Sequence, residues 1–416
     1  MNRWLTFVIF APLFLSSAPA QQLRLDALLA GVSDAHPRIR SALAEIDMQR
    51  GRKLQSLAPP SPRFTFHEEE IPDGAALGSG NQRIWQVSQE FDLPLLIGAR
   101  GYAYGHLQQA AEHRLVFARS MVRAEIIRAY ARWYTRERQL RLQEENLRLA
   151  GEFARKAKLR FEKGETSALE TARARAEEAA ARIAHEQART SLLEASSELS
   201  LAAAFSIDTQ DGITAIAADS LAVKDISRYL DFSLSAAAPQ AAAPLLEALR
   251  EERDAARANA SWRWMEFLPR FEAAWFRQDF RDIGPHWGAE LTASLPLWFL
   301  LDTRGSIEEH SAAARQSDAQ YEITMKEFEN SVRNARRALA AAAATVQSYD
   351  SDLLREAERI ARAAESGYDN GEIGYMEYIA ARQTANGISI NYYDSLAALY
   401  AAIAQYELVT GILILE

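Results

Sequence analysis

The sequence PRFTFHEEEI runs from Pro62 to Ile71, and the sequence PRFEAAWFRQ runs from Pro269 to Gln278. The same Pro-Arg-Phe start therefore occurs twice, 207 residues apart in a chain of 416 residues. Each start opens a short segment that is typical of a β-strand, in a chain otherwise rich in helix-forming residues. Because this separation is close to half of the chain length, an internal repeat has to be considered before any domain is defined.

Further landmarks recur in the same order when the sequence is shifted by 207 residues. Pro37 corresponds to Pro244, the segment FEKGE at 161–165 to YDNGE at 368–372, and Glu170 to Glu377. The segment LPL at 93–95 corresponds to LPL at 295–297 with a slip of five residues, as expected where a loop differs in length. Chance can supply one such match, but the same order along the whole chain predicts a duplication.

The repeat divides the chain into four parts. We expect a signal peptide at 1–20, a first repeat at 21–205, an irregular segment at 206–243 and a second repeat at 244–416. The signal peptide is indicated by Arg3, an apolar run and small residues before Gln21; as a membrane anchor the run is too short. The segment 206–243 is equally compatible with a belt beside the helices and with a plain linker.

Composition excludes several classes of protein. The chain has no cysteine, which excludes disulfides, thiolate metal sites and a lipid attached to cysteine. Its net charge is −9 and both signs are interleaved along helical stretches, so no basic surface for nucleic acid is expected. After the signal peptide, no segment has 18 consecutive apolar residues. An exported chain of this kind can enter a membrane only through β-strands.

Strand patterns occur at 62–94 and at 269–298, one pair in each repeat. The clearest pattern runs from His286 to Leu297, where apolar residues, two of them alanine, alternate strictly with polar residues and glycine up to Leu295. Alternation alone is equally compatible with a half-buried hairpin of a soluble sandwich and with a membrane strand that has one lipid-facing side.

The helical segments favour the membrane alternative. They form two expected hairpins, at 103–205 and at 306–412, and the first helix is about 55 residues or about 85 Å long at the usual rise per residue. Apolar residues recur every seven positions along it: Ile126, Trp133, Leu140, Leu147, Ala154 and Phe161. This spacing is typical of a coiled coil. Helices of this length exceed what a globular domain needs, so we expect long hairpins that pack side by side.

The fold class follows from these elements: mainly α with membrane β. Four strands of about ten residues match the length that crosses an outer membrane, but natural barrels have at least eight strands. The chain is therefore expected to share a β-barrel with copies of itself, whose helical hairpins would stack into a tube, or α-barrel, in the periplasm.

With these features, the chain resembles the TolC family of outer-membrane efflux channels. The resemblance rests on the duplication, the strand pairs entered after proline, the LPL segments leading to GARG at 98–101 and TRG at 303–305, and the two aromatic-x-x-Gly turns. It implies a homotrimer with a twelve-stranded barrel in outer-membrane lipid, a closed periplasmic tip, and two partners: a periplasmic adaptor and an inner-membrane pump, expected to be of the RND type.

Within the family, the chain is most similar to the CzcC-type branch, which serves exporters of divalent cations. The modest length, the lack of cysteine and the end at Glu416 carry this finer resemblance. It implies heavy-metal resistance as the role of the chain. Related channels serve drugs, dyes or secreted proteins, and these cargoes remain alternatives.

The resemblance also implies roles for residues at the two hairpin turns. Gly164 and Glu165 in the first turn, and Gly371 and Glu372 in the second, would contact the adaptor. Glu377 falls where family channels narrow through acidic side chains, so three copies would form a ring of carboxylates. Glu170 is its mate in the first repeat. One helical turn beyond Glu377 lies Ala380, which argues against a second ring.

Other classes of protein fit less well. A periplasmic adaptor would have one hairpin flanked by β-domains, and a structural coiled-coil protein would not need Trp-rich strands. No nucleophile elbow, phosphate loop or metal-ligand spacing indicates an enzyme, a cofactor or a metal site. His106 and His113 lie two turns apart on one expected helix without a recurring partner.

Overall fold

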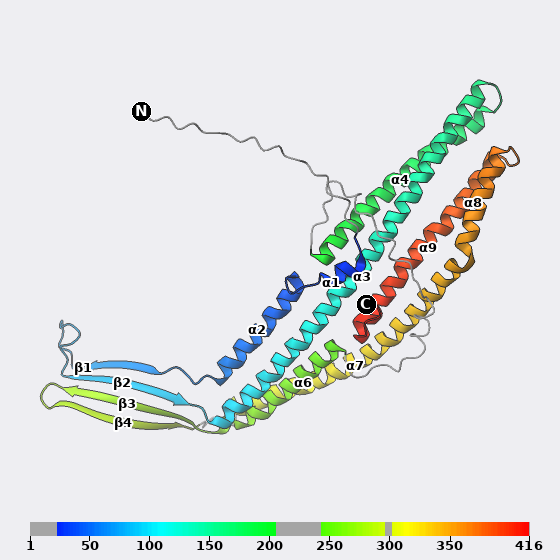
Figure 1. Ribbon diagram of the computed structural model, residues 1–416. Helices are drawn as coiled ribbons and strands as arrows, with labels where there is room; N and C mark the ends of the chain where they lie inside the picture. The colour runs from blue at the N-terminus through cyan, green and yellow to red at the C-terminus, as the bar shows by residue number, and fades with distance from the viewer. Residues whose placement is uncertain (1–22, 205–242, 296–301, 416) are drawn as a thin grey trace, which may run out of the picture. The chain divides into compact units, whose positions relative to one another are not determined.

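The computed structural model describes residues 23–204, 243–295 and 302–415 (Figure 1). The expected signal peptide and nearly all of the expected irregular segment lie outside these residues. The chain forms two compact units: unit 1 comprises Met1–Val32, Glu125–Ser227 and Ala342–Ala401, and unit 2 comprises Ser33–Ala124, Arg228–Ala341 and Ala402–Glu416. Each unit takes residues from both halves of the sequence, so neither unit coincides with an expected repeat.

Both halves contain the same order of helix, strand, strand, long helix and helix. The first half consists of α1 (Leu25–Ala30), α2 (Pro37–Leu57), β1 (Arg63–Glu69), β2 (Gln82–Phe91), α3 (Pro94–Glu162) and α4 (Ala168–Ala203). The second half consists of α6 (Pro244–Arg263), the 3-10 helix η1 (Trp264–Phe267), β3 (Arg270–Phe280), β4 (Gly284–Ser294), α7 (Asp302–Ser348), the π-helix η2 (Tyr349–Leu353), α8 (Leu354–Asp369) and α9 (Tyr375–Thr410).

The long helices begin earlier than the sequence pattern indicates. We expected the first to start near residue 103 and the second near 306, but α3 starts at Pro94 and α7 at Asp302. Proline is well suited to the first turn of a helix, because its missing N–H has no partner there and its φ is already helical. The glycines of GARG therefore lie inside α3 and not in a loop before it.

The four strands form one antiparallel sheet in unit 2, in the order β1-β2-β3-β4. Pairing between β2 and β3 joins the two halves, with Val87 opposite Trp275 and Phe91 opposite Phe271. The outer edges of β1 and β4 pair with no other strand in the described part of the chain.

The two faces of this sheet differ sharply in polarity. Directly paired residues share a face, so the register defines a mainly apolar face, which also carries Gln89 and Arg277. Its apolar residues are Phe64, Phe66, Trp85, Val87, Phe91, Phe271, Ala273, Trp275, Trp287, Ala289, Leu291 and Ala293. Trp287 is 77% exposed and Leu291 is 75% exposed. The polar face carries Glu90, Glu272, Glu290 and Arg270 among its residues. Among the described residues, no second sheet is present to bury the apolar face.

The helices of each unit pack through small and large apolar residues. In unit 2 the core includes Ile39 and Val122, and Arg114 bridges the carboxylates of Glu45 in α2 and Glu252 in α6. In unit 1 the core includes Trp133, and the hydroxyl of Tyr130 donates to the carbonyl of Leu23 at 2.8 Å. None of the helices in the described ranges combines the length and apolar character needed to cross a membrane.

Candidate functional site

The two hairpin turns of unit 1 have the same backbone structure. Gly164 has φ +74° and Gly371 has φ +75°, a left-handed conformation that favours glycine. After α3, the N–H of Glu165 donates to the carbonyl of Arg160 at 2.8 Å; after α8, the N–H of Glu372 donates to the carbonyl of Gly367 at 2.7 Å. These bonds end each helix in a Schellman motif, in which the residue at this position is usually glycine. The glycines that the sequence singled out therefore have a structural reason, and Glu165 and Glu372 lie exposed beside them.

The two candidate gate residues occupy the same position in the helix that follows each turn. Glu170 and Glu377 are each the third residue of their helix, α4 and α9. Glu377 Oε2 accepts from the N–H of Gly374 at 3.4 Å, and the N–H of Glu170 donates to Ser167 Oγ at 3.2 Å. These contacts are halves of capping boxes, which stabilise the starts of helices. The carboxylate of Glu377 thus has a local capping role that sequence reasoning did not assign to it, whereas Glu170 takes part through its backbone N–H.

The structure does not bring the two candidate gate residues into contact. Within the described part of the chain, no hydrogen bond joins Glu170 to Glu377, and Glu377 is exposed. A ring of carboxylates would need further copies of the chain, so the gate role is taken up below as a proposal.

An aromatic cluster lies between the two hairpins, close to their turns. The ring of Phe153 in α3 stacks on that of Tyr375 at 4.2 Å and on that of Tyr378 at 5.5 Å, and it contacts Tyr368 at 4.7 Å. Such contacts contribute about 0.5–1.5 kcal/mol per pair beyond the burial of apolar area. Of these four aromatic residues, the sequence pattern singled out only Tyr368. The spacing of Tyr375 and Tyr378, three residues apart at the start of a helix, could have indicated a shared face.

Burial in this cluster raises the pKa of Tyr375 to about 12, and the nearby carboxylate of Glu177 acts in the same direction. Its hydroxyl has no hydrogen-bond partner among the described residues. A raised pKa in the folded state means that the protonated form stabilises the fold. The stabilisation of the folded state by protonated Tyr375 is complete below pH 10 and is lost as the pH rises towards 12.

We therefore expect wild-type protein to lose more stability between pH 10 and pH 12 than the Tyr375→Phe variant, which cannot ionise there. The difference between the phenolate absorbance titrations of the two proteins should give a transition near pH 12. A difference titration centred near pH 10 would contradict the burial of this hydroxyl.

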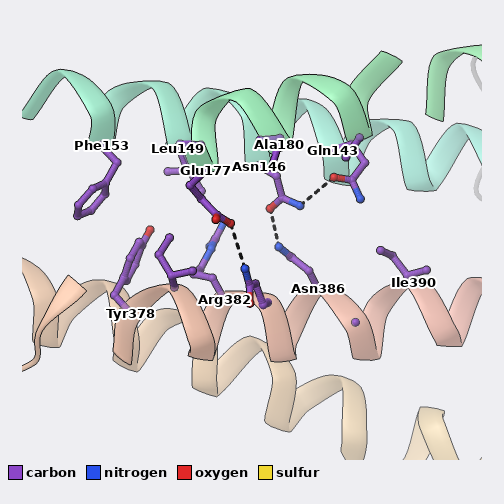
Figure 2. Close-up of a pocket in the computed structure, with 16 residues that line it drawn as sticks. Gln143, Asn146, Leu149, Phe153, Glu177, Ala180, Tyr378, Arg382, Asn386 and Ile390 are labelled. Carbon is purple, nitrogen blue, oxygen red and sulfur yellow. Dashed lines mark hydrogen bonds between the residues drawn. The ribbon is translucent and has the colours of Figure 1, made fainter. Parts of the chain in front are cut away.

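Polar side chains connect the two hairpins along a cleft of about 330 Å³ below the aromatic cluster. Figure 2 shows side chains of α3 and α4 pointing towards those of α9. Asn386 donates to Asn146 Oδ1 at 2.5 Å, and Gln383 donates to Glu177 Oε1 at 3.0 Å. These residues could not be identified from the sequence, because single amides on a helix surface carry no distinctive pattern.

Three comparisons relate this geometry to known proteins. Among solved structures, a membrane protein from Pseudomonas aeruginosa matches with a TM-score of 0.75 and 18% identity, covering 93% of this chain and 90% of its own. The CmeC outer membrane channel of Campylobacter jejuni matches with a TM-score of 0.74 and 14% identity, covering 99% of this chain and 94% of its own. CusC matches with a TM-score of 0.71 and 13% identity, covering 98% of both chains. No curated protein matches the sequence.

Residues 31–204 match the family model described as outer membrane efflux protein. This range contains α2, the strand pair β1 and β2, the long helices α3 and α4, and the first turn. Residues 31–204 are therefore similar to outer membrane efflux proteins. The resemblance to TolC-family channels, which the sequence indicated through its strand entries and turns, is confirmed.

The structure offers no pocket with a cluster of metal-binding groups in its described part. Among the described residues, no group of three or more His, Asp or Glu side chains is arranged to hold a metal ion. His106 pairs with Glu251 at 2.6 Å across α3 and α6, and no contact joins it to His113.

Proposed function

We propose that this chain is the outer-membrane channel of a tripartite efflux system. In this proposal, three copies share a twelve-stranded β-barrel, and their helical hairpins form a tunnel in the periplasm. The observation that carries it is the four-stranded sheet with one exposed apolar face and two unpaired edges. Unpaired edges join other strands readily, and a closed ring of strands leaves no edge.

The same proposal accounts for the two halves of the chain and for its export. We infer that the halves arose by duplication, since their elements follow one order and their turns share one hydrogen-bond pattern. A signal peptide at 1–20 would deliver the chain to the periplasm, and the apolar face of the sheet would then contact outer-membrane lipid. A protein of this kind needs detergent for extraction and runs as a trimer in mass measurements. Release from cells without detergent would favour the alternative, a periplasmic adaptor.

The hairpin turns are proposed to contact the adaptor. Gly164 and Glu165, and Gly371 and Glu372, lie at turns of identical geometry, so both can present the same backbone and a charged side chain to hairpins of a partner. The adaptor would in turn connect the channel to an inner-membrane pump, proposed to be of the RND type. A photo-crosslinker at Glu165 or Glu372 tests this contact in cells, with exposed Arg182 in α4 as a control site.

We propose that Glu377 narrows the channel for cations, with Glu170 in a lesser role. The variant Glu377→Gln tests this well, because glutamine preserves the capping box and removes only the charge. In lipid bilayers, the purified variant should lose cation selectivity relative to wild type, and Glu170→Gln should lose less. Selectivity that Glu377→Gln leaves unchanged would exclude the ring, while intact thermal stability of the variant would show that the helix start is preserved.

The proposed cargo is divalent metal cations, on the basis of the resemblance to the CzcC-type branch. Deleting the gene and measuring growth on metals, antibiotics and dyes tests this part separately. Sensitivity confined to zinc, cobalt, cadmium, nickel or copper supports the cation cargo. Sensitivity confined to organic compounds would contradict the metal cargo and indicate a drug cargo instead. The channel proposal would remain intact.

A further inference from the structure

The long helix of the second hairpin contains a π-helix that the first hairpin lacks. Helix α3 is continuous from Pro94 to Glu162, whereas α7 and α8 are separated by η2 at Tyr349–Leu353. π-helices are rare, and each arises mostly as a short segment inserted into an α-helix. The ribbon in Figure 1 changes direction where α7 ends and α8 begins.

Before η2, the buried residues of α7 follow those of α3 with a separation of 206 positions. Val332, Leu339 and Val346 recur every seven residues, and none of them is more than 4% exposed. Their counterparts 206 positions earlier are Ile126, Trp133 and Leu140, which are equally buried. The same seven-residue seam therefore runs along both long helices up to this point.

After η2, the separation between corresponding buried residues is 207 positions. Ala357 and Ala364 in α8 are buried, and so are Ala150 and Ala157 in α3. The separation of 207 continues through the turns, where Gly371 corresponds to Gly164. One residue has therefore been added to the second hairpin between Val346 and Ala357.

The position of the added residue coincides with η2. An α-helix that gains one residue would rotate all later side chains by about 100° and break the seam. A π-turn takes up the added residue locally, and the seam resumes in its former phase. Leu353 lies seven residues after Val346, where an uninterrupted seam would bury it, but it is 41% exposed. The burial pattern thus identifies the insertion independently of the hydrogen bonds of the helix.

We propose that η2 is a one-residue insertion that gives the second hairpin, and not the first, a bending point. Weakened helical hydrogen bonding at a π-turn permits a change of direction without loss of the packed seam on either side. The segment beyond it carries the turn at Gly371 and the carboxylate of Glu377. The bend is a property of the hairpin alone; its use in moving Glu377 within a channel rests on the proposed function.

The insertion is tested by two single-residue deletions. Deleting Asp352 removes the added residue, so we expect a continuous α-helix and a folded protein with thermal stability close to wild type. Deleting exposed Arg333 from the middle of α7 shifts the seam where nothing absorbs the shift, so we expect loss of folded protein. If deletion of Asp352 were as damaging as deletion of Arg333, the insertion would be excluded.

The bending point is tested by pulsed electron paramagnetic resonance on the full chain, which has no cysteine of its own. A spin-label pair at Gln347 and Glu372 spans η2, and a pair at Arg141 and Glu165 is the matched control on α3. Dilution with unlabelled chain restricts the distances to one protomer. We expect a broad distribution for the first pair, narrowed by deletion of Asp352, and a narrow one for the control. If the distance distribution of the first pair had the same width with and without Asp352, a bending point would be excluded.

Efflux measurements on the same deletion separate this inference from the proposed function. If the chain is a channel that uses the bend, cells with the Asp352 deletion lose protection although the protein folds and reaches the envelope. A full gene deletion without any sensitivity would count against the proposed function, while the distance measurements would still decide the bend.

Discussion

Replacing Glu407 with alanine is expected to destabilise the protein by about 3–5 kcal/mol, because the change leaves a buried charge without its partner. The side chain of Glu407 is only 3% exposed. Its Oε2 accepts from Arg123 Nε at 2.9 Å, and its Oε1 accepts from the N–H groups of Ile414 and Leu415 at 2.7 and 2.8 Å. One carboxylate therefore connects α3 to the segment that follows α9, and all of these residues belong to unit 2.

Chemical denaturation in detergent, followed by tryptophan fluorescence, measures this effect. The matched control is Asp34→Ala, which breaks an exposed ion pair with Arg119 in the same unit. Exposed pairs contribute about 0–1 kcal/mol, so the control should remain close to wild type. The variant Glu407→Gln keeps an oxygen that can accept from the backbone N–H groups. Its free energy of unfolding should therefore lie between those of Glu407→Ala and Asp34→Ala. Equal stability of Glu407→Ala and Asp34→Ala would show that the buried pair does not hold this end of the chain.

The sequence predicted the elements of the fold well where each residue pattern is local. Strict alternation from His286 onwards indicated a strand, and β4 spans Gly284–Ser294. Seven-residue spacing from Ile126 to Phe161 indicated one long helix, and α3 contains all of it. These patterns suffice because burial of one face dictates the period of the apolar residues.

Features that depend on residues far apart in the chain were harder to predict from the sequence. The early start of α3 was missed, because proline after a strand is compatible both with a loop and with the first turn of a helix. The π-helix was missed, because an added residue is visible only after the buried positions of both halves are compared. The capping role of Glu377 could have been inferred, since Glu three residues after a cap position is a known signal. The cluster around Phe153 depends on contacts between residues more than 200 positions apart.

The two faces of the sheet lead to a second large effect, at neighbouring residues of β4. Leu291 lies on the apolar face, opposite Ala273, whereas Thr292 lies on the polar face, opposite Glu272. Under the proposed function, Leu291 contacts lipid and Thr292 lines the interior. Arginine on the lipid face of a barrel costs about 2–4 kcal/mol near the middle of the membrane, and arginine in the interior is tolerated.

We therefore expect Leu291→Arg to reduce strongly the amount of folded trimer in the outer membrane, while Thr292→Arg assembles like wild type. Both variants introduce the same side chain into the same strand, so propensity and net charge are matched, and only the face differs. Heat-modifiable migration in gels and fractionation of envelopes measure the assembled protein. Because Thr292 pairs with Glu272, its arginine gains a neighbouring carboxylate, which favours assembly further. If both variants assembled equally, the apolar face would not contact lipid, and the sheet would need a protein partner to cover Trp287 and Leu291 instead.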